Sequence, residues 1–279
     1  MYKIAAIITV HNRKEKTLSC LECLYEQNLP QSSELDVFLT DDGCTDGTSE
    51  AVMLNYPQTH IVKGDGTLFW NRGMYAAWQE AAKFSPDFYL WINDDTVLND
   101  GCILSLFSTS LKKNHTAIIV GTTVSGFDDK TLTYGGRTVK GHFSVIQPSE
   151  NDALPCEIFN GNIVLIPRKV FERVGFNDFY YRHSFGDFDY GIKAKKNGIQ
   201  SFIAPGILGF CANNHPVPIY QRKCYSVIKR FQLLYSPLGI NPFEDFHYQK
   251  KIHNMFYCIL HFIKLHINVF LVKDHTACE

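Results

Sequence analysis

The sequence lacks a long hydrophobic run at its start, and it lacks an excess of either charge. The apolar stretch from Lys3 to Val10 is too short for a signal peptide or a membrane-spanning helix. The 27 Lys and Arg residues nearly balance the 28 Asp and Glu residues, which gives a formal net charge of −1. Proteins that bind nucleic acid by neutralising its phosphates carry a basic excess. We therefore expect no nucleic-acid partner and a cytoplasmic location.

The sequence also lacks the regular cysteine spacing of a disulfide framework. Its nine cysteines are odd in number and scattered, which favours reduced thiols. Cys20 and Cys23 form the only close pair, and without a second pair to complete a zinc site we assign them to core packing. No repeat or low-complexity segment is present. The 279 residues, 45% of them hydrophobic, suit one large α/β domain with or without an appendage.

The first half of the chain alternates strand and helix patterns. Repeated strand–helix units predict a doubly wound, mostly parallel sheet. Ligands bind such sheets at the carboxyl ends of the strands, so the polar loops 11–13, 41–47 and 93–96 become the candidate cleft. The expected strands are 3–10, 35–40, 60–62 and 87–92, and the expected helices follow 13 and cover 48–55 and 71–84.

The pattern changes after about residue 125. Gly135-Gly136 predicts a hairpin, and hence a small mixed or antiparallel addition to the sheet. A strand over 158–166 is interrupted by Asn160-Gly161-Asn162, and a helix is expected over 187–197. We divide the chain into a first half (1–125), a second half (126–218) and a helical extension (219–279).

The extension is basic and apolar. Residues 222–279 contain eight Lys or Arg and four Asp or Glu, so their charge is +4 against −5 for the rest. Between Ile252 and Val272 fifteen of twenty-one positions are apolar. One Lys and three His in this window argue against a membrane span. Two interpretations stay open: a helix packed on the domain, or a segment (250–272) lying on an anionic membrane surface.

The strongest local signal is Asn93-Asp94-Asp95, which follows an apolar strand. Adjacent carboxylates at a strand end repel one another, and a divalent cation would supply the missing positive charge. Mg²⁺ or Mn²⁺ typically binds one or two carboxylates together with substrate phosphates. The alternative is that these acids cap the helix that starts near Asp100.

A second polar loop runs from Asp41 to Thr48. Asp41 lies at a strand end, where its carboxylate could accept hydrogen bonds from a base or ribose. Gly43 and Gly47 permit tight turns, and Thr45 or Asp46 can cap the next helix. Taken alone this string is a weak signal, because Asp-Gly turns are common.

Three segments together resemble family 2 glycosyltransferases of the GT-A fold. They are Thr9-Val10-His11-Asn12-Arg13, Asp41-Asp42-Gly43-Cys44-Thr45-Asp46-Gly47-Thr48 and Asn93-Asp94-Asp95, and the similarity covers roughly residues 3–215. The resemblance implies an inverting transferase in which Thr9, His11 and Asp41 contact the nucleoside and Asp95 binds the metal ion. We add Arg13 and Asp94 to the donor-binding residues. The resemblance also implies that 1–125 form the half that binds the nucleotide-sugar donor and that 126–218 form the acceptor-binding and catalytic half of the same domain. Asn93 departs from the first Asp of the family's usual Asp-x-Asp motif, which leaves the role of this position open.

The segment Gly64-Asp65-Gly66-Thr67-Leu68-Phe69-Trp70 resembles a branch of the family that includes many bacterial rhamnosyltransferases. On this basis Asp65 and Trp70 are expected to line the donor-binding site. The alternative is an ordinary glycine-containing turn.

A third group of acids lies in Gly186-Asp187-Phe188-Asp189. An inverting transfer needs one general base to deprotonate the acceptor hydroxyl. Family members usually carry Glu-Asp-x-Asp here, so Gly186 replaces the Glu and Asp187 occupies the position of the base. Asp189 is expected to cap or brace the loop, and it is also a possible contact for the acceptor or a phosphate. The alternative is that both acids only cap the 187–197 helix.

Two further residues are weaker candidates for acceptor or phosphate contacts. Asn160 interrupts a strand, and a β-bulge explains it equally well. His215 could contact a phosphate or the metal ion, although a lone His is more often structural.

The predicted function is the transfer of a sugar, rhamnose favoured, from a dTDP- or UDP-sugar to a saccharide acceptor in bacterial surface polysaccharide (O-antigen type) synthesis. The basic, apolar tail favours a lipid-linked acceptor and peripheral attachment to the inner face of the plasma membrane. Nucleotidyl transfer is disfavoured, because 9–13 contain no glycine to grip a triphosphate. The remaining alternative is a non-catalytic nucleotide-sugar or saccharide binding protein.

Overall fold

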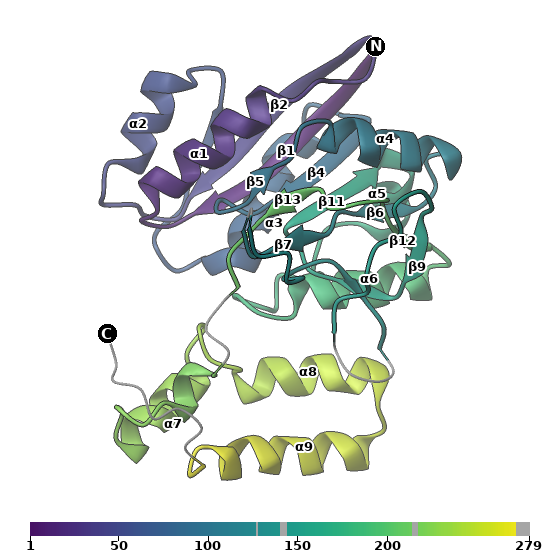
Figure 1. The fold of residues 1–279 in the computed structure, drawn as a ribbon. Coiled ribbons are helices and arrows are strands. Elements are labelled where there is room, and N and C mark those ends of the chain that lie inside the picture. The colour runs from purple at the N-terminus through teal and green to yellow at the C-terminus, as the bar shows by residue number, and fades with distance from the viewer. Residues whose placement is uncertain (127, 140–143, 214–216, 272–279) are drawn as a thin grey trace.

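Helices cover both faces of an eight-stranded sheet, and three further helices form a separate layer at the C-terminal end (Figure 1). The computed structural model describes residues 1–126, 128–139, 144–213 and 217–271. The strand order in the large sheet is β3-β2-β1-β4-β11-β6-β12-β9. The first four of these strands run parallel, whereas β11 is antiparallel to both of its neighbours. This mixed α/β architecture confirms the predicted fold class.

The strands are β1 (Tyr2–Val10), β2 (Ser33–Asp41), β3 (His60–Lys63), β4 (Phe88–Ile92), β5 (Val97–Leu98), β6 (Ile118–Val120), β7 (Thr123–Val124), β8 (Gly136–Arg137), β9 (Leu154–Cys156), β10 (Ile158–Phe159), β11 (Ile163–Pro167), β12 (Ser201–Ile203) and β13 (Gly209–Phe210). The helices are α1 (Lys14–Tyr25), α2 (Thr48–Asn55), α3 (Phe69–Ala82), α4 (Cys102–Lys112), α5 (Arg168–Val174), α6 (Gly186–Lys196), the 3₁₀ turn η1 (Ile219–Gln221), α7 (Val227–Tyr235), α8 (Pro242–Ile252) and α9 (Met255–Asn268). Two small sheets, β5-β13-β7 and β10-β8, complete the described structure.

Strand β1 shows why the sheet is covered on both sides. Successive side chains of a strand point to opposite faces. Ile4, Ala6 and Ile8 pack with α1, α2 and α4, whereas Ala5 and Ile7 pack with α3, α5 and α6. A strand buried on both faces is apolar throughout, which is the pattern of parallel sheets.

The hairpin predicted at Gly135-Gly136 is wrong. Gly136 instead lies inside β8, which pairs antiparallel with β10. A Cβ atom at Gly136 would come within 2.5 Å of Ile203 and 2.8 Å of Cys156, so glycine is needed here for close packing rather than for a turn.

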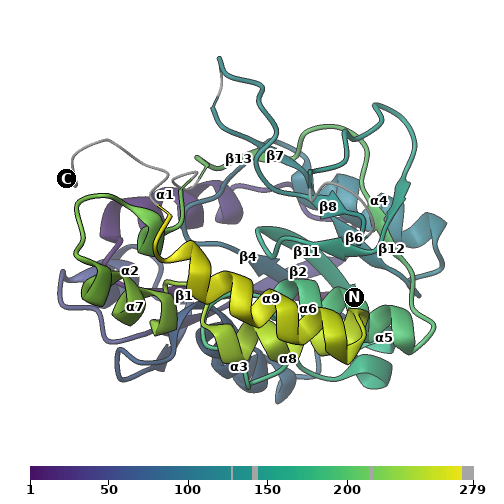
Figure 2. The same cartoon turned by 90° about the horizontal axis from the view of Figure 1, so that it is seen from below.

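The C-terminal helices form an outer layer, and α9 is its outermost element when the molecule is seen from below (Figure 2). Helix α8 begins with Pro242 after the cap Asn241, and Asn254 caps α9. Cys258 and Leu265 are the buried side chains of α9, so this helix packs on the protein by one face only. No helix within the described ranges is long and apolar enough to span a bilayer.

The thiols differ from the expectation at one position. Seven of the cysteines are free, among them Cys20 and Cys23. Cys20 is buried in the core beneath α1, and Cys23 packs against it, as expected for a packing pair. Cys224 is disulfide-bonded, so the expectation that all thiols are reduced is wrong there.

Candidate active site

The three polar loops meet at one edge of the sheet. Strands β1 and β2 are paired in parallel up to Val10 and Asp41, and β4 lies on the other side of β1. The ring of His11 lies 2.6 Å from the backbone oxygen of Asp42. Thr9, the next inward residue of β1, is buried, and a Cβ at Gly73 of α3 would approach its hydroxyl to 2.0 Å. Residues from separate βα units are therefore in direct contact at this edge.

Arg13 joins the first loop to the acid pair. Its Nη1 donates to Asp94 Oδ1 and its Nη2 donates to Asp95 Oδ2, both at 2.8 Å. One planar guanidinium thus spans two adjacent carboxylates, a geometry that a Lys ammonium cannot reproduce. The two acids raise the pKa of Arg13 although burial opposes this.

The acid pair suits a hard divalent cation. Burial raises the pKa of Asp94 to about 6, with Arg13 opposing and Asp95 adding to the rise. Asp94 Oδ2 is buried without a hydrogen-bond partner among the described residues, and buried orphaned oxygens call for a ligand. Carboxylate oxygens are the ligands that Mg²⁺ and Mn²⁺ prefer. The described chain holds no cluster of three or more His, Cys, Asp or Glu side chains that could bind a metal ion, so substrate oxygens and water would complete the shell.

Helix capping does not account for these acids. The cap of α4 is Gly101 in a left-handed conformation (φ 75°), and it has no side-chain cap hydrogen bond. The alternative raised for Asp94 and Asp95 thus has no support in the geometry of α4.

Asp42 is a structural residue that sequence reasoning missed. Its buried carboxylate accepts hydrogen bonds from the backbone N–H groups of Gly66, Leu68 and Phe69, at 2.8 to 3.2 Å. These bonds fix the loop that leads into α3. The signal in the sequence is the second Asp of Asp41-Asp42, a carboxylate directly after the end of β2.

Trp70 connects the acid loop to the opposite side of the site. Its indole Nε1 donates to Asn93 Oδ1 at 2.7 Å. A Cβ at Gly161 would approach the same ring to 2.4 Å, so the ring lies directly on this glycine. Asn93 therefore has a defined role as the acceptor for Trp70, a role that the oxygen of an amide or of a carboxylate can fill.

Asp41 and Asp65 are occupied by local hydrogen bonds. The Asp41 carboxylate accepts from Lys63 at 2.8 Å, from Ser49 and from the backbone of Cys44 at 2.7 Å. Burial alone would raise the pKa of Asp41, but these donors lower it well below its usual value. Exposed Asp65 accepts from the backbone and hydroxyl of Thr67 in a turn. Their donor contacts stay predictions.

Asp187 lies at the start of α6 and faces the loop between β10 and β11. Its Oδ2 accepts from Gly161 N–H at 3.0 Å and its Oδ1 accepts from Phe188 N–H at 2.8 Å. Burial raises the pKa of Asp187 to about 6, against the hydrogen bonds and the charge of Arg137. Arg137 also donates to Asn160 Oδ1 at 2.9 Å, and no sequence signal had indicated this arginine. A carboxyl group with this pKa can accept a proton near neutral pH.

Gly186 is explained by Asn71. A Cβ atom at Gly186 would lie 1.8 Å from Asn71 Oδ1. Asn71 is fully buried, donates to the backbone oxygens of Asp178 and Tyr181 at 2.8 Å, and accepts from Asn177. The space that a family Glu would enter is thus filled by a side chain of α3 that holds the 177–181 loop.

We expect Gly186→Ala to destabilise the protein by about 1–3 kcal/mol, the usual cost of overpacking. The methyl group must displace Asn71 and its hydrogen bonds. Urea unfolding of the variant, with Gly126→Ala as control, measures the effect, because Gly126 has open space around its Cβ position and, like Gly186, does not have a positive φ. A cost no larger than that of the control would contradict this packing.

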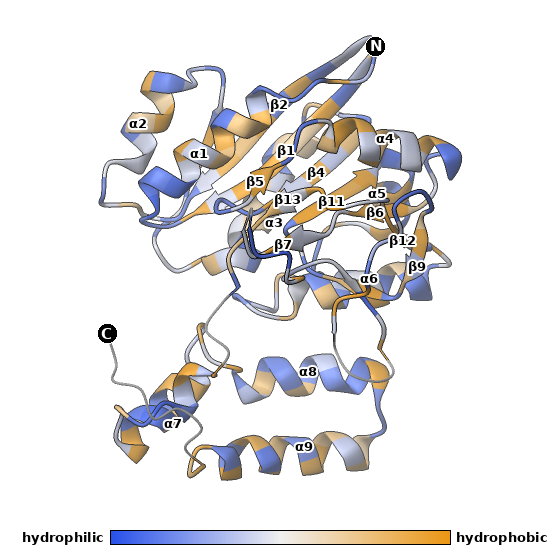
Figure 3. Ribbon diagram, viewed as in Figure 1, coloured by the Kyte–Doolittle hydropathy of each residue, from blue (hydrophilic) through white to orange (hydrophobic). Residues whose placement is uncertain are grey.

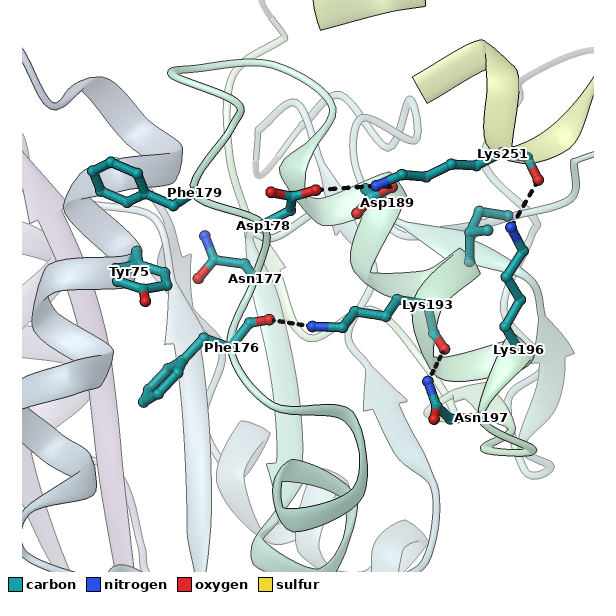
Figure 4. Close-up of a pocket in the computed structure, with 11 residues that line it drawn as sticks. Tyr75, Phe176, Asn177, Asp178, Phe179, Asp189, Lys193, Lys196, Asn197 and Lys251 are labelled. Carbon is teal, nitrogen blue, oxygen red and sulfur yellow. Dashed lines mark hydrogen bonds and ion pairs between the residues drawn. The ribbon is translucent and has the colours of Figure 1, made fainter. Parts of the chain in front are cut away.

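Asp189 points away from Asp187. It forms an ion pair with Lys251 of α8 at 2.7 Å and accepts from the Tyr181 hydroxyl at 3.2 Å. Asp189 and Lys251 border a cavity of about 570 Å³ between α3, α6 and α8, shown in Figure 4. Lys251 also reaches Asp178 at 3.1 Å. Asp189 therefore ties helix α8 to α6, the helix that also carries Asp187, and its expected acceptor or phosphate contact stays a prediction.

Two histidines bear on the site: His183, which lies near Arg13, and the predicted contact His215. His183 Nδ1 is buried and lacks a hydrogen-bond partner in the described part of the chain. Burial, and then the nearby charge of Arg13, lower the pKa of His183 to about 4, so the ring is neutral. His183 was not predicted, and a lone His in a loop carries no sequence signal. His215 lies outside the described residues.

Comparisons with known proteins agree on family and fold. Residues 5–175 match the family model described as glycosyl transferase family 2. No curated protein sequence matches the chain.

Several solved structures share the fold at low identity. The Staphylococcus aureus TarS structure is 12% identical with a TM-score of 0.56, and the alignment covers 96% of this chain but only 44% of TarS. TarS 1–349 in complex with UDP-GlcNAc gives the same identity and TM-score, with 96% and 73% covered. The mannosyltransferase PcManGT of Pyrobaculum calidifontis, in complex with GDP-Man and Mn²⁺, is 15% identical with a TM-score of 0.55, with 96% and 84% covered.

Proposed function

The chain belongs to glycosyl transferase family 2, and from this premise we propose that it is an inverting, metal-dependent transferase. It moves a sugar from a nucleoside diphosphate donor onto a saccharide hydroxyl. Residues 1–125 bind the donor, 126–218 bind the acceptor and supply the base, and 219–279 form the helical extension.

One observation carries this proposal: Trp70 links a buried acid pair to a carboxyl group whose pKa is raised. Its indole binds Asn93 beside Asp94 and Asp95. Its ring packs on Gly161, whose N–H binds Asp187. A donor-phosphate site and a proton acceptor on two sides of one ring are what a single-displacement transfer needs.

The reaction follows from these positions. Asp187 takes the proton of the acceptor hydroxyl as its oxygen attacks the anomeric carbon. The bond from that carbon to the diphosphate oxygen breaks on the opposite face, so the configuration inverts. The N–H groups of Gly161 and Phe188 orient the Asp187 carboxylate. Arg13 provides positive charge on the donor side.

Asp95, with Asp94 beside it, would hold a Mg²⁺ or Mn²⁺ ion. The bound ion would neutralise the negative charge of the departing diphosphate. The complex of PcManGT with GDP-Man and Mn²⁺ and the complex of TarS with UDP-GlcNAc support a divalent ion and a nucleotide-sugar donor. We propose a dTDP- or UDP-sugar as the donor. Rhamnose is the favoured sugar because segment 64–70 is similar to the corresponding segment of rhamnosyltransferases.

The experiment that tests the function separates an enzyme from a binding protein. Calorimetry with UDP-, dTDP- and GDP-sugars in the presence of Mn²⁺ identifies the donor that binds. Transfer to a saccharide acceptor is then followed for that donor. Tight binding without any transfer or hydrolysis would favour the non-catalytic alternative and contradict the proposal.

The acceptor is proposed to be lipid-linked, reached from the cytoplasmic face of the membrane. Helix α9 supports this, because one of its faces is exposed and apolar, as the orange bands in Figure 3 illustrate. On α9 the face is formed by Phe256, Ile259, Leu260, Ile263 and Ile267, and the exposed Phe270 and Leu271 follow the helix. The net charge of +4 over 222–279 favours an anionic bilayer.

We expect Ile263→Glu to weaken binding to vesicles of anionic lipid by about 10- to 100-fold, because an apolar side chain is lost from the buried face and a negative charge is added. Ile263 is 48% exposed, so the fold should be unaffected. Leu111→Glu is the matched control on α4, where Leu111 is 56% exposed. Co-sedimentation measures both variants, and equal binding by them would contradict membrane attachment through α9.

A further inference from the structure

Arg13 occupies the position at which a cation would approach the acid pair. Its two terminal nitrogens each contact a different carboxylate at 2.8 Å. The other oxygen of Asp95, Oδ1, is 3.4 Å from the thiol of Cys211, which donates to it. Both oxygens of the predicted metal ligand are therefore engaged within the protein itself.

A divalent ion and Arg13 cannot share this position. A metal ion bound to Asp95 Oδ2 would face the guanidinium at close range, and two positive charges at such a distance repel each other strongly in a partly buried site. The Arg13 side chain is 39% exposed, and the Asp95 side chain is 16% exposed. The arginine thus has solvent on one side into which its side chain can move, whereas Asp95 is less exposed and is also bonded to Cys211.

We propose that Arg13 is an internal competitor of the metal ion and that the donor diphosphate releases the acid pair by drawing Arg13 onto its own oxygens. This inference rests on the proposed function, since it assigns the same site a binding order. Without nucleotide, Arg13 neutralises Asp94 and Asp95, and the metal ion binds weakly. With nucleotide bound, the guanidinium can pair instead with the diphosphate. Two of its N–H groups can then donate to two oxygens of that anion, as they can to a carboxylate. Metal and nucleotide therefore strengthen each other's binding by the same factor.

His183 fits this arrangement. Its ring is neutral beside Arg13, and its buried Nδ1 has no partner within the described ranges. A neutral ring does not repel the arginine and does not compete with it as a second positive charge for the carboxylates.

The test measures Mn²⁺ binding directly, from the electron paramagnetic resonance signal of the free ion, with and without UDP and dTDP. For the wild type we expect the preferred nucleotide to raise Mn²⁺ affinity by about 5- to 150-fold, the usual range of coupling between two ligands. Arg13→Gln should bind Mn²⁺ more tightly without nucleotide and lose most of the coupling. Arg13→Lys should fall between, because an ammonium cannot span both carboxylates.

Lys16→Gln is the matched control. Lys16 is an exposed residue of α1 whose charge acts on Asp94 without touching it. If Lys16→Gln and Arg13→Gln change Mn²⁺ affinity equally, the effect is general charge removal and the inference is overturned. It is also overturned if Arg13→Gln keeps the wild-type coupling; the proposed function then stands, because both ligands still bind. Failure of every form of the protein to bind Mn²⁺ would overturn the inference and the proposed metal site together.

Discussion

Asp187→Asn should lower kcat by about 10²- to 10⁴-fold and leave donor affinity unchanged. An amide cannot take the proton of the acceptor hydroxyl, and general-base catalysis contributes about this factor. The amide has nearly the same shape, so the loop held by Gly161 and Phe188 should persist. Transfer is measured with saturating donor, and donor affinity is measured by calorimetry.

The pH profile gives an independent check on the same residue. The ionised carboxylate is the active form, and burial raises the pKa of Asp187 to about 6. Activity should therefore rise as the pH increases through about 6 and should be lost below it. An Asp with an ordinary pKa would keep its activity down to about pH 4. The residual activity of Asp187→Asn should not show this acidic limb, and a variant with the wild-type rate and profile would exclude Asp187 as the base.

Asp95→Asn should reduce metal-supported kcat/KM by about 100-fold or more. Charge stabilisation by a bound metal ion is worth several kcal/mol, and each 1.36 kcal/mol is a factor of about ten in rate. The variant should also need more Mn²⁺ for half-maximal rate. Activity is measured against Mn²⁺ concentration at fixed donor.

Asp46→Asn is the control for this substitution. Asp46 lies in the neighbouring loop, where it is exposed and accepts from the backbone N–H groups of Lys14 and Thr48. Its loss should leave the Mn²⁺ requirement unchanged. Equal metal dependence in Asp95→Asn and the wild type would contradict Asp95 as the ligand.

Much of the fold could be predicted because short-range patterns of apolar and polar residues determine it. Apolar runs that stop at polar residues mark the ends of β1, β2 and β4. The carboxyl ends of parallel strands lie at one edge, so Arg13 and the 93–95 loop could be expected to be neighbours. The structure brings them to within 2.8 Å of each other.

Contacts between distant residues could not be predicted in this way. Asn93 binds Trp70, which is 23 positions away, and Asn71 fills the space beside Gly186. At both departures from the family pattern the contacting residue comes from α3, and no periodicity links those positions. The same holds for Gly136, where a packing requirement resembles a turn signal in the sequence.

The most direct test of the central claim is the release of nucleoside diphosphate from a panel of UDP-, dTDP- and GDP-sugars, with Mn²⁺, with Mg²⁺ and with a chelator. We predict slow turnover of one donor that requires the metal ion, is lost in Asp95→Asn, and is coupled to transfer when a saccharide acceptor is added. Turnover that is equally fast in the chelator would contradict the metal site. A failure of every donor to bind or react would contradict the assignment of this chain as an active glycosyltransferase.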